Sequence, residues 1–297
     1  MEEEGTIEGK ILKGIGGFYY ISDKDDVVHE CKARGRFRKD KIVPLPGDNV
    51  VFSPQEGEKY GFIEEITPRI NQLKRPQVAN IDQVIITMAT RSPNPDLMLI
   101  DKLLLTASIA DIAPVVCINK IDLANKKNAK ELAKQYSREY PVHIVSAKSG
   151  KGLRSIYKVL RGKTTCFAGQ SAVGKSSILN ALFKELELET GVLSKKTERG
   201  KHTTRHAELI KLNKVGGIVV DTPGFSLLDT GEIEPVDIGK HYPEISNISE
   251  PCKFSSCLHK SEPGCKVKEA VESGEFSTER YERYLKIIDE VEKGRKI

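Results

Sequence analysis

Residues 1–68 consist of short apolar and polar runs that glycine and proline separate. The segments GKILKGIGGFYYIS, RGRFRKDKIVPLPGDNVVFSP and GFIEEITP follow this pattern, and none of them shows the 3.6-residue period of a helix. Several short strands with such turn residues between them are typical of a small β-barrel or sandwich. We therefore predict a β domain over residues 1–68.

Residues 69–232 change to alternating strands and helices. Apolar strand-like runs occur in IDQVIITMA, PVVCIN, PVHIVSA, TTCFAG and GGIVVDTPG, and helical runs in PDLMLIDKLLLTASIA, NAKELAKQYSREY and SSILNALFK. In the first helical run the apolar residues Leu97, Ile100, Leu103, Leu104 and Ala107 have helical spacing. This alternation predicts a parallel sheet covered by helices.

Residues 233–297 begin with an irregular, proline-containing stretch and end in a predicted helix. Tyr281, Tyr284, Leu285, Ile288 and Val291 fall on one face of that helix. The fold class expected is therefore multi-domain α/β, with three domains over residues 1–68, 69–232 and 233–297.

The composition of the chain limits the classes of protein to which it can belong. The chain has 297 residues, of which 38% are hydrophobic and 30% charged, so it is folded rather than disordered. Its net charge of +5 permits binding to nucleic acid but does not demand it. The start MEEEGTIEG lacks the features of a signal peptide, and the apolar stretch over residues 97–118 is too polar to span a bilayer. We expect a cytoplasmic protein, without a membrane and monomeric by default.

A basic run surrounds Phe37. It consists of Arg34, Arg36, Arg38, Lys39 and Lys41. Two interpretations stay open, a solvated surface and a contact with RNA.

The segment GQSAVGKS fits the phosphate-loop pattern, which is glycine, four residues and Gly-Lys-Ser. Its residues are Gly169, Gln170, Ser171, Ala172, Val173, Gly174, Lys175 and Ser176. The glycines let backbone N–H groups turn toward phosphates, Lys175 adds positive charge at the outer phosphates, and the Ser176 hydroxyl can bind Mg²⁺. An apolar strand precedes the segment and a helix follows, so the positive end of the helix points at the anion.

The tetrapeptide NKID, from Asn119 to Asp122, ends the strand PVVCIN. An aspartate there can accept hydrogen bonds from guanine N1–H and the amino group, whereas adenine would leave the carboxylate unpaired. The weaker signal DTPG, from Asp221 to Gly224, ends the strand GGIVV. At that place Asp221 can reach the Mg²⁺ shell and the Gly224 N–H can meet the γ-phosphate.

These elements, with SAK (Ser146, Ala147, Lys148), are those of GTPases, but their order is unusual. Other GTPases place the phosphate loop first. Here NKID and SAK precede it, and the Thr203/Thr204 region and DTPG follow, which indicates a circular permutation. Chain order does not fix which strands are neighbours, so the same site can form.

A Cys/His set lies near the C-terminus with the spacing C-x4-C-x-H-x5-C. It comprises Cys252, Cys257, His259 and Cys265. Three thiolates and one imidazole predict a closed, structural Zn²⁺ site; free thiols in a loop are the alternative. Cys117 and Cys166 lie in apolar runs, where buried free thiols are expected.

The whole chain resembles the ribosome small subunit-dependent GTPase A family, also called RsgA, YjeQ or YloQ. The segments that resemble it are RPQVANIDQV, NKID, FAGQSAVGKSSILN, RGKHTT, DTPGF and the Cys/His set. The resemblance implies an OB-fold barrel, a permuted GTPase domain and a zinc domain. It also implies binding to the small ribosomal subunit and its rRNA late in subunit maturation, and GTP hydrolysis to GDP and phosphate that the subunit stimulates.

The resemblance also implies site residues. Asn119, Lys120 and Asp122 would recognise guanine, with the Ala147 N–H nearby. The residues that would hold phosphates and Mg²⁺ are Gly174, Lys175, Ser176 and Ser177. Thr203 or Thr204 would close over Mg²⁺, and Thr204 with Ser176 is taken as its ligand set.

The residues alone leave open which group orients the attacking water. Many GTPases have glutamine directly after DxxG, but this chain has Phe225 there. The family resemblance favours His202 in RGKHTT, with His206 as the competing assignment. A signalling or transport NTPase without an RNA partner, or an RNA-binding zinc protein that holds nucleotide only structurally, are the other functions considered.

Overall fold

The computed structural model describes residues 5–54, 60–74, 76–123, 126–185, 207–221 and 233–294. Contacts divide the chain into two compact units. One comprises residues 1–83, 157–166 and 182–225, and the other residues 84–156, 167–181 and 226–297.

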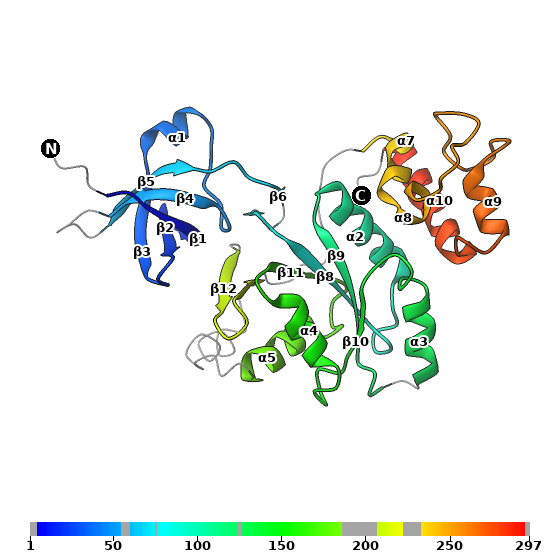
Figure 1. Cartoon of the computed structure of the whole chain (residues 1–297), viewed down its shortest axis with the longest axis horizontal. Coiled ribbons are helices and arrows are strands. Elements are labelled where there is room, and N and C mark those ends of the chain that lie inside the picture. The colour runs from blue at the N-terminus through cyan, green and yellow to red at the C-terminus, as the bar shows by residue number, and fades with distance from the viewer. Residues whose placement is uncertain are drawn as a thin grey trace. The chain divides into compact units, whose positions relative to one another are not determined.

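The N-terminal residues form a closed five-stranded barrel, which confirms the predicted β domain (Figure 1). Its strands are β1 (Ile7–Ile15), β2 (Phe18–Asp23), β3 (Val28–Ala33), β4 (Asn49–Ser53) and β5 (Gly61–Ile66), in the order β1-β2-β3-β5-β4. Only the β3–β5 pair is parallel among these neighbours. Ile11, Ile21, Phe52 and Ile63 are fully buried inside the barrel, because alternate side chains on a strand point to opposite faces.

The basic run differs from the expectation of strands alone. Residues Gly35–Lys39 form a short helix, α1, that buries Phe37 against the barrel core. One apolar residue in five leaves no period to detect, which is why the sequence pattern missed it. Two short strands, β6 (Gln72–Leu73) and β7 (Val78–Ala79), pair next along the chain.

A six-stranded sheet follows, in the order β10-β9-β8-β11-β13-β12. The strands are β8 (Gln83–Ala89), β9 (Ala113–Asn119), β10 (Val142–Ile144), β11 (Thr164–Ala168), β12 (Glu208–Leu212) and β13 (Gly217–Asp221). The pairs β9–β10 and β11–β13 are parallel, as predicted, while β12 is an antiparallel edge strand that the sequence analysis did not anticipate. The helices are α2 (Leu97–Ile109), α3 (Lys126–Lys134), α4 (Leu153–Leu160) and α5 (Lys175–Glu185), and α4 was also not predicted.

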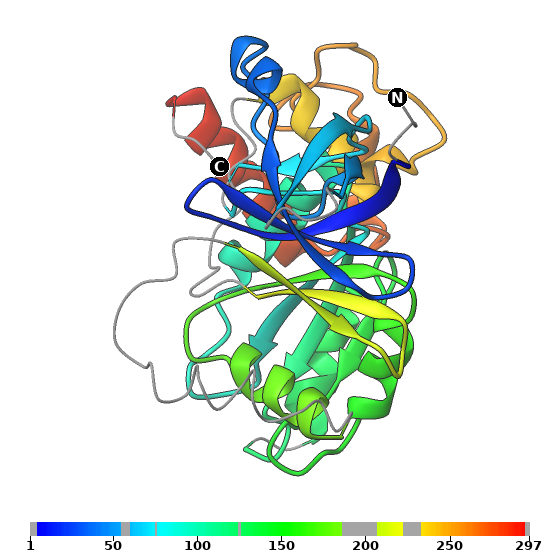
Figure 2. The same cartoon turned by 90° about the vertical axis from the view of Figure 1, so that its left-hand side faces the viewer.

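The strand β12 lies beside the barrel within the same unit (Figure 2, yellow beside blue). Lys211 on β12 donates to Ser22 Oγ at 2.7 Å and pairs with Asp26, and Lys13 on β1 lies 3.2 Å from Glu208. These side chains are partly exposed, so each pair contributes at most about 1 kcal/mol.

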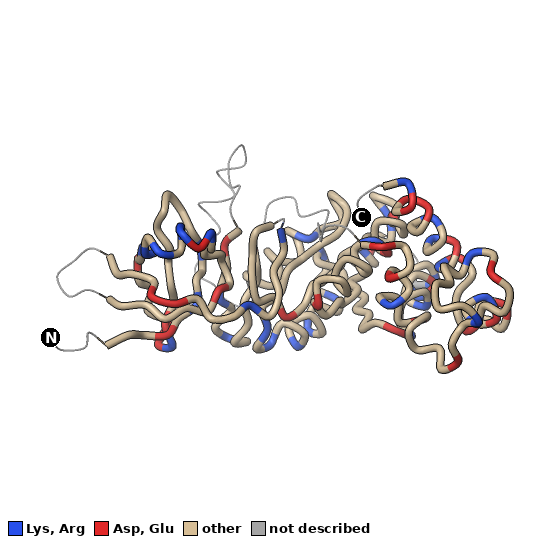
Figure 3. Tube along the Cα trace, turned by 90° about the horizontal axis from the view of Figure 1, so that it is seen from above, with Lys and Arg blue, Asp and Glu red and all other residues tan. Residues whose placement is uncertain are grey.

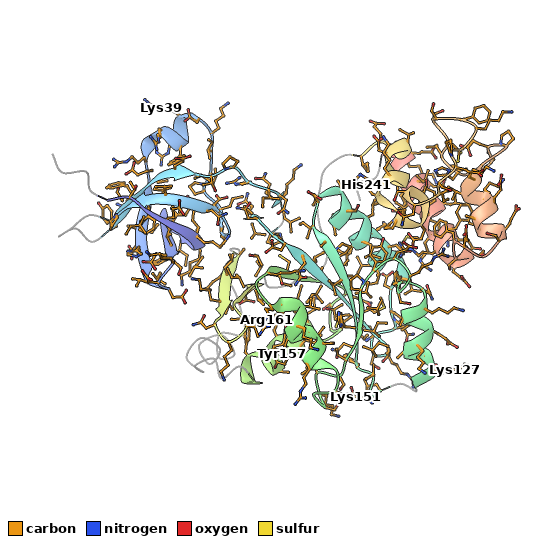
Figure 4. The ribbon with its side chains drawn as sticks, viewed as in Figure 1. Lys39, Lys127, Lys151, Tyr157, Arg161 and His241 are labelled. Carbon is orange, nitrogen blue, oxygen red and sulfur yellow. The ribbon has the colours of Figure 1, made fainter. Side chains whose placement is uncertain are left out.

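The C-terminal residues form short helices and one long helix. They are α7 (Pro235–Ile238), the 3₁₀ helix η1 (Gly239–His241), α8 (Pro243–Ser246), α9 (Lys266–Glu272) and α10 (Thr278–Glu292). His241 is labelled in Figure 4, and its Nδ1 lies 3.1 Å from Ser108 Oγ of α2. Tyr284 and Ile288 are buried on α10, as predicted.

Two arginines share that buried face of α10. Arg280 and Arg283 both bond the carboxylate of Asp101 on α2, at 3.1 and 2.5 Å, and Asp101 has no exposed surface. Arg280 also pairs with Glu244 at 2.5 Å and lies 5.1–5.4 Å from the rings of Tyr136, Tyr140 and Tyr242. This network holds α10 on α2. Each buried charge in it is compensated by its partners, and removing one partner would leave the others buried without compensation.

We expect Asp101→Asn to release α10. Removing one partner of a buried ion pair leaves the arginines uncompensated, at a cost of about 3–5 kcal/mol. Hydrogen exchange of the α10 amides measures the loss as a fall in opening free energy. The matched control is Asp237→Asn, which breaks an exposed pair with Lys240, at 2.5 Å, and should leave α10 unchanged. Unchanged protection of α10 in Asp101→Asn would show that apolar packing alone holds this helix.

Candidate nucleotide site and metal centre

The phosphate-loop segment connects β11 to α5, as the pattern required. Gly169 has φ +129°, and a Cβ there would lie 2.0 Å from the carbonyl oxygen of Thr87 on β8. Gly174 has φ +100°, and a Cβ there would lie 2.3 Å from the side-chain nitrogen of Asn119. Only glycine fits either place, because of both the backbone conformation and the lack of room.

Lys175 turns its side chain back over the loop. Its Nζ donates to the carbonyl oxygens of Gly169 at 2.7 Å and Gln170 at 2.9 Å. Burial lowers the pKa of Lys175. These bonds hold the ammonium group inside the curve of the loop, at the N-terminus of α5, where an anion would be stabilised.

Asn119 connects three segments of the site. It ends β9 and is 1% exposed. Its Oδ1 accepts from Ala147 N at 3.0 Å, and its Nδ2 donates to Val173 O at 3.0 Å. One amide group therefore joins NKID, SAK and the phosphate loop.

Lys120 makes a second link. Its backbone has φ +63°, and its Nζ donates to Ala172 O at 2.7 Å. The same Nζ also bonds Ser92 O, and Thr90 Oγ1 donates to Lys120 O at 2.7 Å. The sequence analysis missed Thr90, which acts through its hydroxyl group, and Ser92, which acts through its backbone carbonyl group; no residue pattern marks either contact.

Asp122 lies on the surface beside SAK. Its Oδ1 accepts from Ser146 Oγ at 2.5 Å, and this hydrogen bond is the main cause that lowers the pKa of Asp122 below its ordinary value. Ser146 is fully buried, and its Oγ also accepts from Ser149 N at 3.1 Å. The aspartate is thus ionised near neutral pH and held as a hydrogen-bond acceptor, which guanine recognition needs.

The remaining predicted residues are placed as follows. In the phosphate loop and its helix, Ser171, Ala172, Ser176 and Ser177 are exposed, as is Lys148 in SAK. Asp221 is the last residue of β13. His202, Thr203, Thr204 and Gly224 lie outside the described residues, as do the competing His206 and Phe225.

The four Cys/His residues come together in the C-terminal part. Their ligand atoms all lie within 4.8 Å of one another. The Cys252 and Cys265 sulfurs are 4.0 Å apart, and His259 Nδ1 lies 3.6 and 3.4 Å from them. A tetrahedral zinc site with bonds of about 2.3 Å has edges of about 3.8 Å, so this set fits a closed site.

The helix α10 forms hydrogen bonds to the loop that carries this cluster. Tyr281 and Tyr284 donate from their hydroxyls to the carbonyl oxygens of His259, at 2.5 Å, and Leu258, at 3.3 Å. Lys260 pairs with Asp289 at 2.6 Å. The same helix therefore holds both the Cys/His loop and Asp101, through neighbouring side chains.

Cys117 and Cys166 are buried in the sheet, as expected, and burial raises the pKa of Cys117 to about 12. Both thiols are therefore inert.

Comparison with known proteins agrees with this geometry. A sequence profile described as RsgA GTPase matches residues 66–231, more than half of the chain. The chain belongs to the RsgA GTPase family. A profile for the RsgA N-terminal domain also matches residues 8–63. This membership makes the chain a GTPase, and it agrees with the closed barrel observed over the same N-terminal residues.

Named relatives cover nearly the full chain. A protein called small ribosomal subunit biogenesis GTPase RsgA from Ruminiclostridium cellulolyticum is 49% identical, with 94% of this chain and 92% of that protein aligned. The protein of the same name from Bacillus subtilis is 43% identical, with 96% and 97% aligned. These relatives confirm the family that the sequence resembled.

Two solved structures are also similar. The crystal structure of YjeQ from Thermotoga maritima has a TM-score of 0.84 and 36% identity and covers 97% of this chain and 99% of that one. YloQ, described as a circularly permuted GTPase, has a TM-score of 0.83 and 37% identity and covers 100% and 99%. They confirm the predicted permuted fold. In the described part of the chain no helix has the length and apolar character needed to cross a membrane.

We expect zinc chelation to loosen the Cys/His loop but not α10. The loop has few apolar side chains of its own, whereas α10 is also held by Asp101, which no metal touches. Hydrogen exchange should show lost protection over residues 250–265, retained protection in α10, and a change in GTP affinity of less than about twofold. Cys257→Ser should reproduce the effect without chelator, while Cys31→Ala in the barrel should not. Loss of α10 protection on chelation would mean that metal holds the entire C-terminal part.

Proposed function

We propose that this protein hydrolyses GTP to GDP and phosphate while bound to the small ribosomal subunit, and that it assists late maturation of that subunit. The relatives' names, which describe small ribosomal subunit biogenesis, support the partner. The observation that supports the nucleotide most directly is the Asn119 side chain. It bonds both the phosphate loop and SAK, so a phosphate-binding and a base-binding segment adjoin.

In this proposal each segment has one task. Lys175 and the loop N–H groups hold the phosphates, and Asp122 accepts from the guanine N1–H and amino groups. Ser146 donates a hydrogen bond to Asp122, and Ala147 is the next residue in the chain. The Ala147 N–H, which donates to Asn119, is therefore proposed to lie near the base. Mg²⁺, when bound, would neutralise charge on the outer phosphates, with Ser176 and Thr204 as the proposed ligands and Asp221 in its outer shell.

The barrel and the C-terminal part have proposed roles as well. Zn²⁺ in the Cys/His cluster would stabilise the C-terminal loop, and the barrel would contact rRNA. The proposed domain limits remain residues 1–68, 69–232 and 233–297, and a cytoplasmic monomer is proposed as the working form. Lys and Arg are interspersed with Asp and Glu along the tube in Figure 3, so the charge distribution alone does not identify an RNA surface.

The function is tested by GTP hydrolysis with and without small ribosomal subunits. We expect the subunits to raise the turnover number by at least an order of magnitude, because a partner that orders the catalytic groups stabilises the transition state. Large subunits serve as the control. ATP should bind roughly 10⁴-fold more weakly, because adenine leaves Asp122 unpaired. Equal turnover with and without small subunits would contradict the proposed partner, and equal affinity for ATP would contradict the base assignment.

The catalytic group is tested by His202→Ala. We expect normal GTP affinity and a fall of about 100-fold or more in subunit-stimulated hydrolysis, since Phe225 cannot orient water. His206→Ala is the matched control and should retain most of the activity. If the two variants exchange these results, His206 is the catalytic histidine.

A further inference from the structure

The barrel carries a row of aromatic and basic side chains on its outer surface. Ile21, Cys31 and Ile63 are buried in the barrel core. The register pairs Phe18 with Lys32 and Lys32 with Phe62, on strands β2, β3 and β5. These three residues alternate with the core residues along each strand, so they point outward.

Tyr60, the residue before β5, contacts the rings of both Phe18 and Phe62. Phe18 and Tyr60 have ring centroids 5.8 Å apart at 72°, and Tyr60 and Phe62 have centroids 5.8 Å apart at 78°. All three are half-buried and none belongs to the barrel core. An aromatic surface therefore extends continuously across β2 and β5; we call Phe18, Tyr60 and Phe62 the ring triad.

Cations cover the ring triad, but they are held differently. Arg34 lies 4.9 Å from the Phe62 centroid and is fixed by two bonds to Glu64, at 2.7 and 2.5 Å. Lys32 Nζ lies 3.9 Å from the Tyr60 centroid and 4.8 Å from that of Phe18. Among the described residues no carboxylate pairs with Lys32. The Lys32 ammonium group can therefore leave the Tyr60 ring for another partner at a small cost in free energy.

We propose that the ring triad and Lys32 bind an unpaired segment of RNA, with bases stacked on the rings. A base displaces the Lys32 ammonium group from Tyr60, and the ammonium group moves to a phosphate of the same strand. Both new contacts are of the kind that single-strand-binding proteins use. Duplex RNA is excluded from this mode, because its bases are stacked inside the helix and cannot reach the rings.

The basic run around α1 is a different surface. Arg36, Arg38 and Lys39 are exposed, and Lys39 lies on the outer side of α1 in Figure 4, but Phe37 is buried and cannot stack with a base. This run can contact phosphates of any nucleic acid, paired or unpaired. The ring triad thus adds a preference for unpaired bases. The inference rests on the proposed function, and it adds the surface and the form of the RNA.

A tryptophan probe tests the contact directly, because the chain contains no tryptophan. The variant Phe18→Trp is titrated with an unpaired RNA oligonucleotide and with a duplex of equal phosphate number. We expect the oligonucleotide to quench the fluorescence and the duplex to leave it unchanged. The matched control is Phe254→Trp in the Cys/His loop, an exposed ring that also has a lysine over it, Lys253 at 5.6 Å. Equal quenching in both variants, or equal quenching by duplex, would overturn the proposal.

Two further variants separate the roles. Tyr60→Leu should weaken binding of the oligonucleotide by roughly 5- to 150-fold while keeping the salt dependence, because only stacking is lost. Lys32→Met should reduce the slope of log affinity against log salt by about 0.7, because one phosphate contact is lost. Circular dichroism checks that each barrel stays folded. Unchanged affinity in folded Tyr60→Leu would overturn the proposal.

The proposed function fails separately from this inference. If wild-type hydrolysis responds to small subunits but Tyr60→Leu binds the oligonucleotide normally, the surface is wrong and the function stands. If the subunits never stimulate the wild type, the proposed partner is wrong, whatever the ring triad binds.

Discussion

The nucleotide site depends on the amide group of Asn119. Its two hydrogen bonds, to Ala147 N and Val173 O, join segments that lie 28 and 54 residues away in the chain. A hydrogen bond depends on the positions of its donor and acceptor atoms in space, and not on the order of their residues along the chain. A circular permutation therefore preserves the site as long as β9, β10 and β11 keep their places in the sheet. Gly174 is part of the same constraint, because any side chain there would collide with Asn119.

Much of this site could be predicted from sequence because its signals are local. GQSAVGKS and NKID each combine fixed residues with a strand, which is the context that gives the motifs their meaning. Thr90 and Ser92 could not be found in this way, since they act through a side chain and a carbonyl group brought close by β8 and β9. Periodicity also fails for α1, whose one large apolar residue is Phe37, and for β12, whose apolar residues Leu209, Ile210 and Leu212 do not alternate strictly with polar ones. His202 and the two threonines stay predictions, because they lie outside the described residues.

The helix α10 shows a different limit of sequence patterns. The apolar period correctly selected Tyr284 and Ile288, but Arg280 and Arg283 are buried on the same side. An arginine is buried only when its charge and donors are matched, and the partner Asp101 is 179 residues distant from Arg280 in the chain. No local pattern reports such a partner. A charged residue within a predicted apolar face is nevertheless a useful signal, because it implies a buried acid elsewhere.

The barrel and the C-terminal part are each attached to elements of the GTPase fold, by interactions of unequal strength. Exposed pairs, those of Lys13 with Glu208 and Lys211 with Asp26, connect the barrel to β12, and salt weakens such pairs. The C-terminal part is attached through a buried network that salt hardly reaches. β12 and β13 lie between the RGKHTT segment and DTPG, the two segments expected to respond to the γ-phosphate. The weaker attachment thus joins the barrel to the β12–β13 hairpin, which lies between these two expected segments in the chain. A small change in free energy is enough to break such exposed pairs. The stronger one keeps the Cys/His loop in a fixed relation to α2, whose preceding loop contacts Lys120.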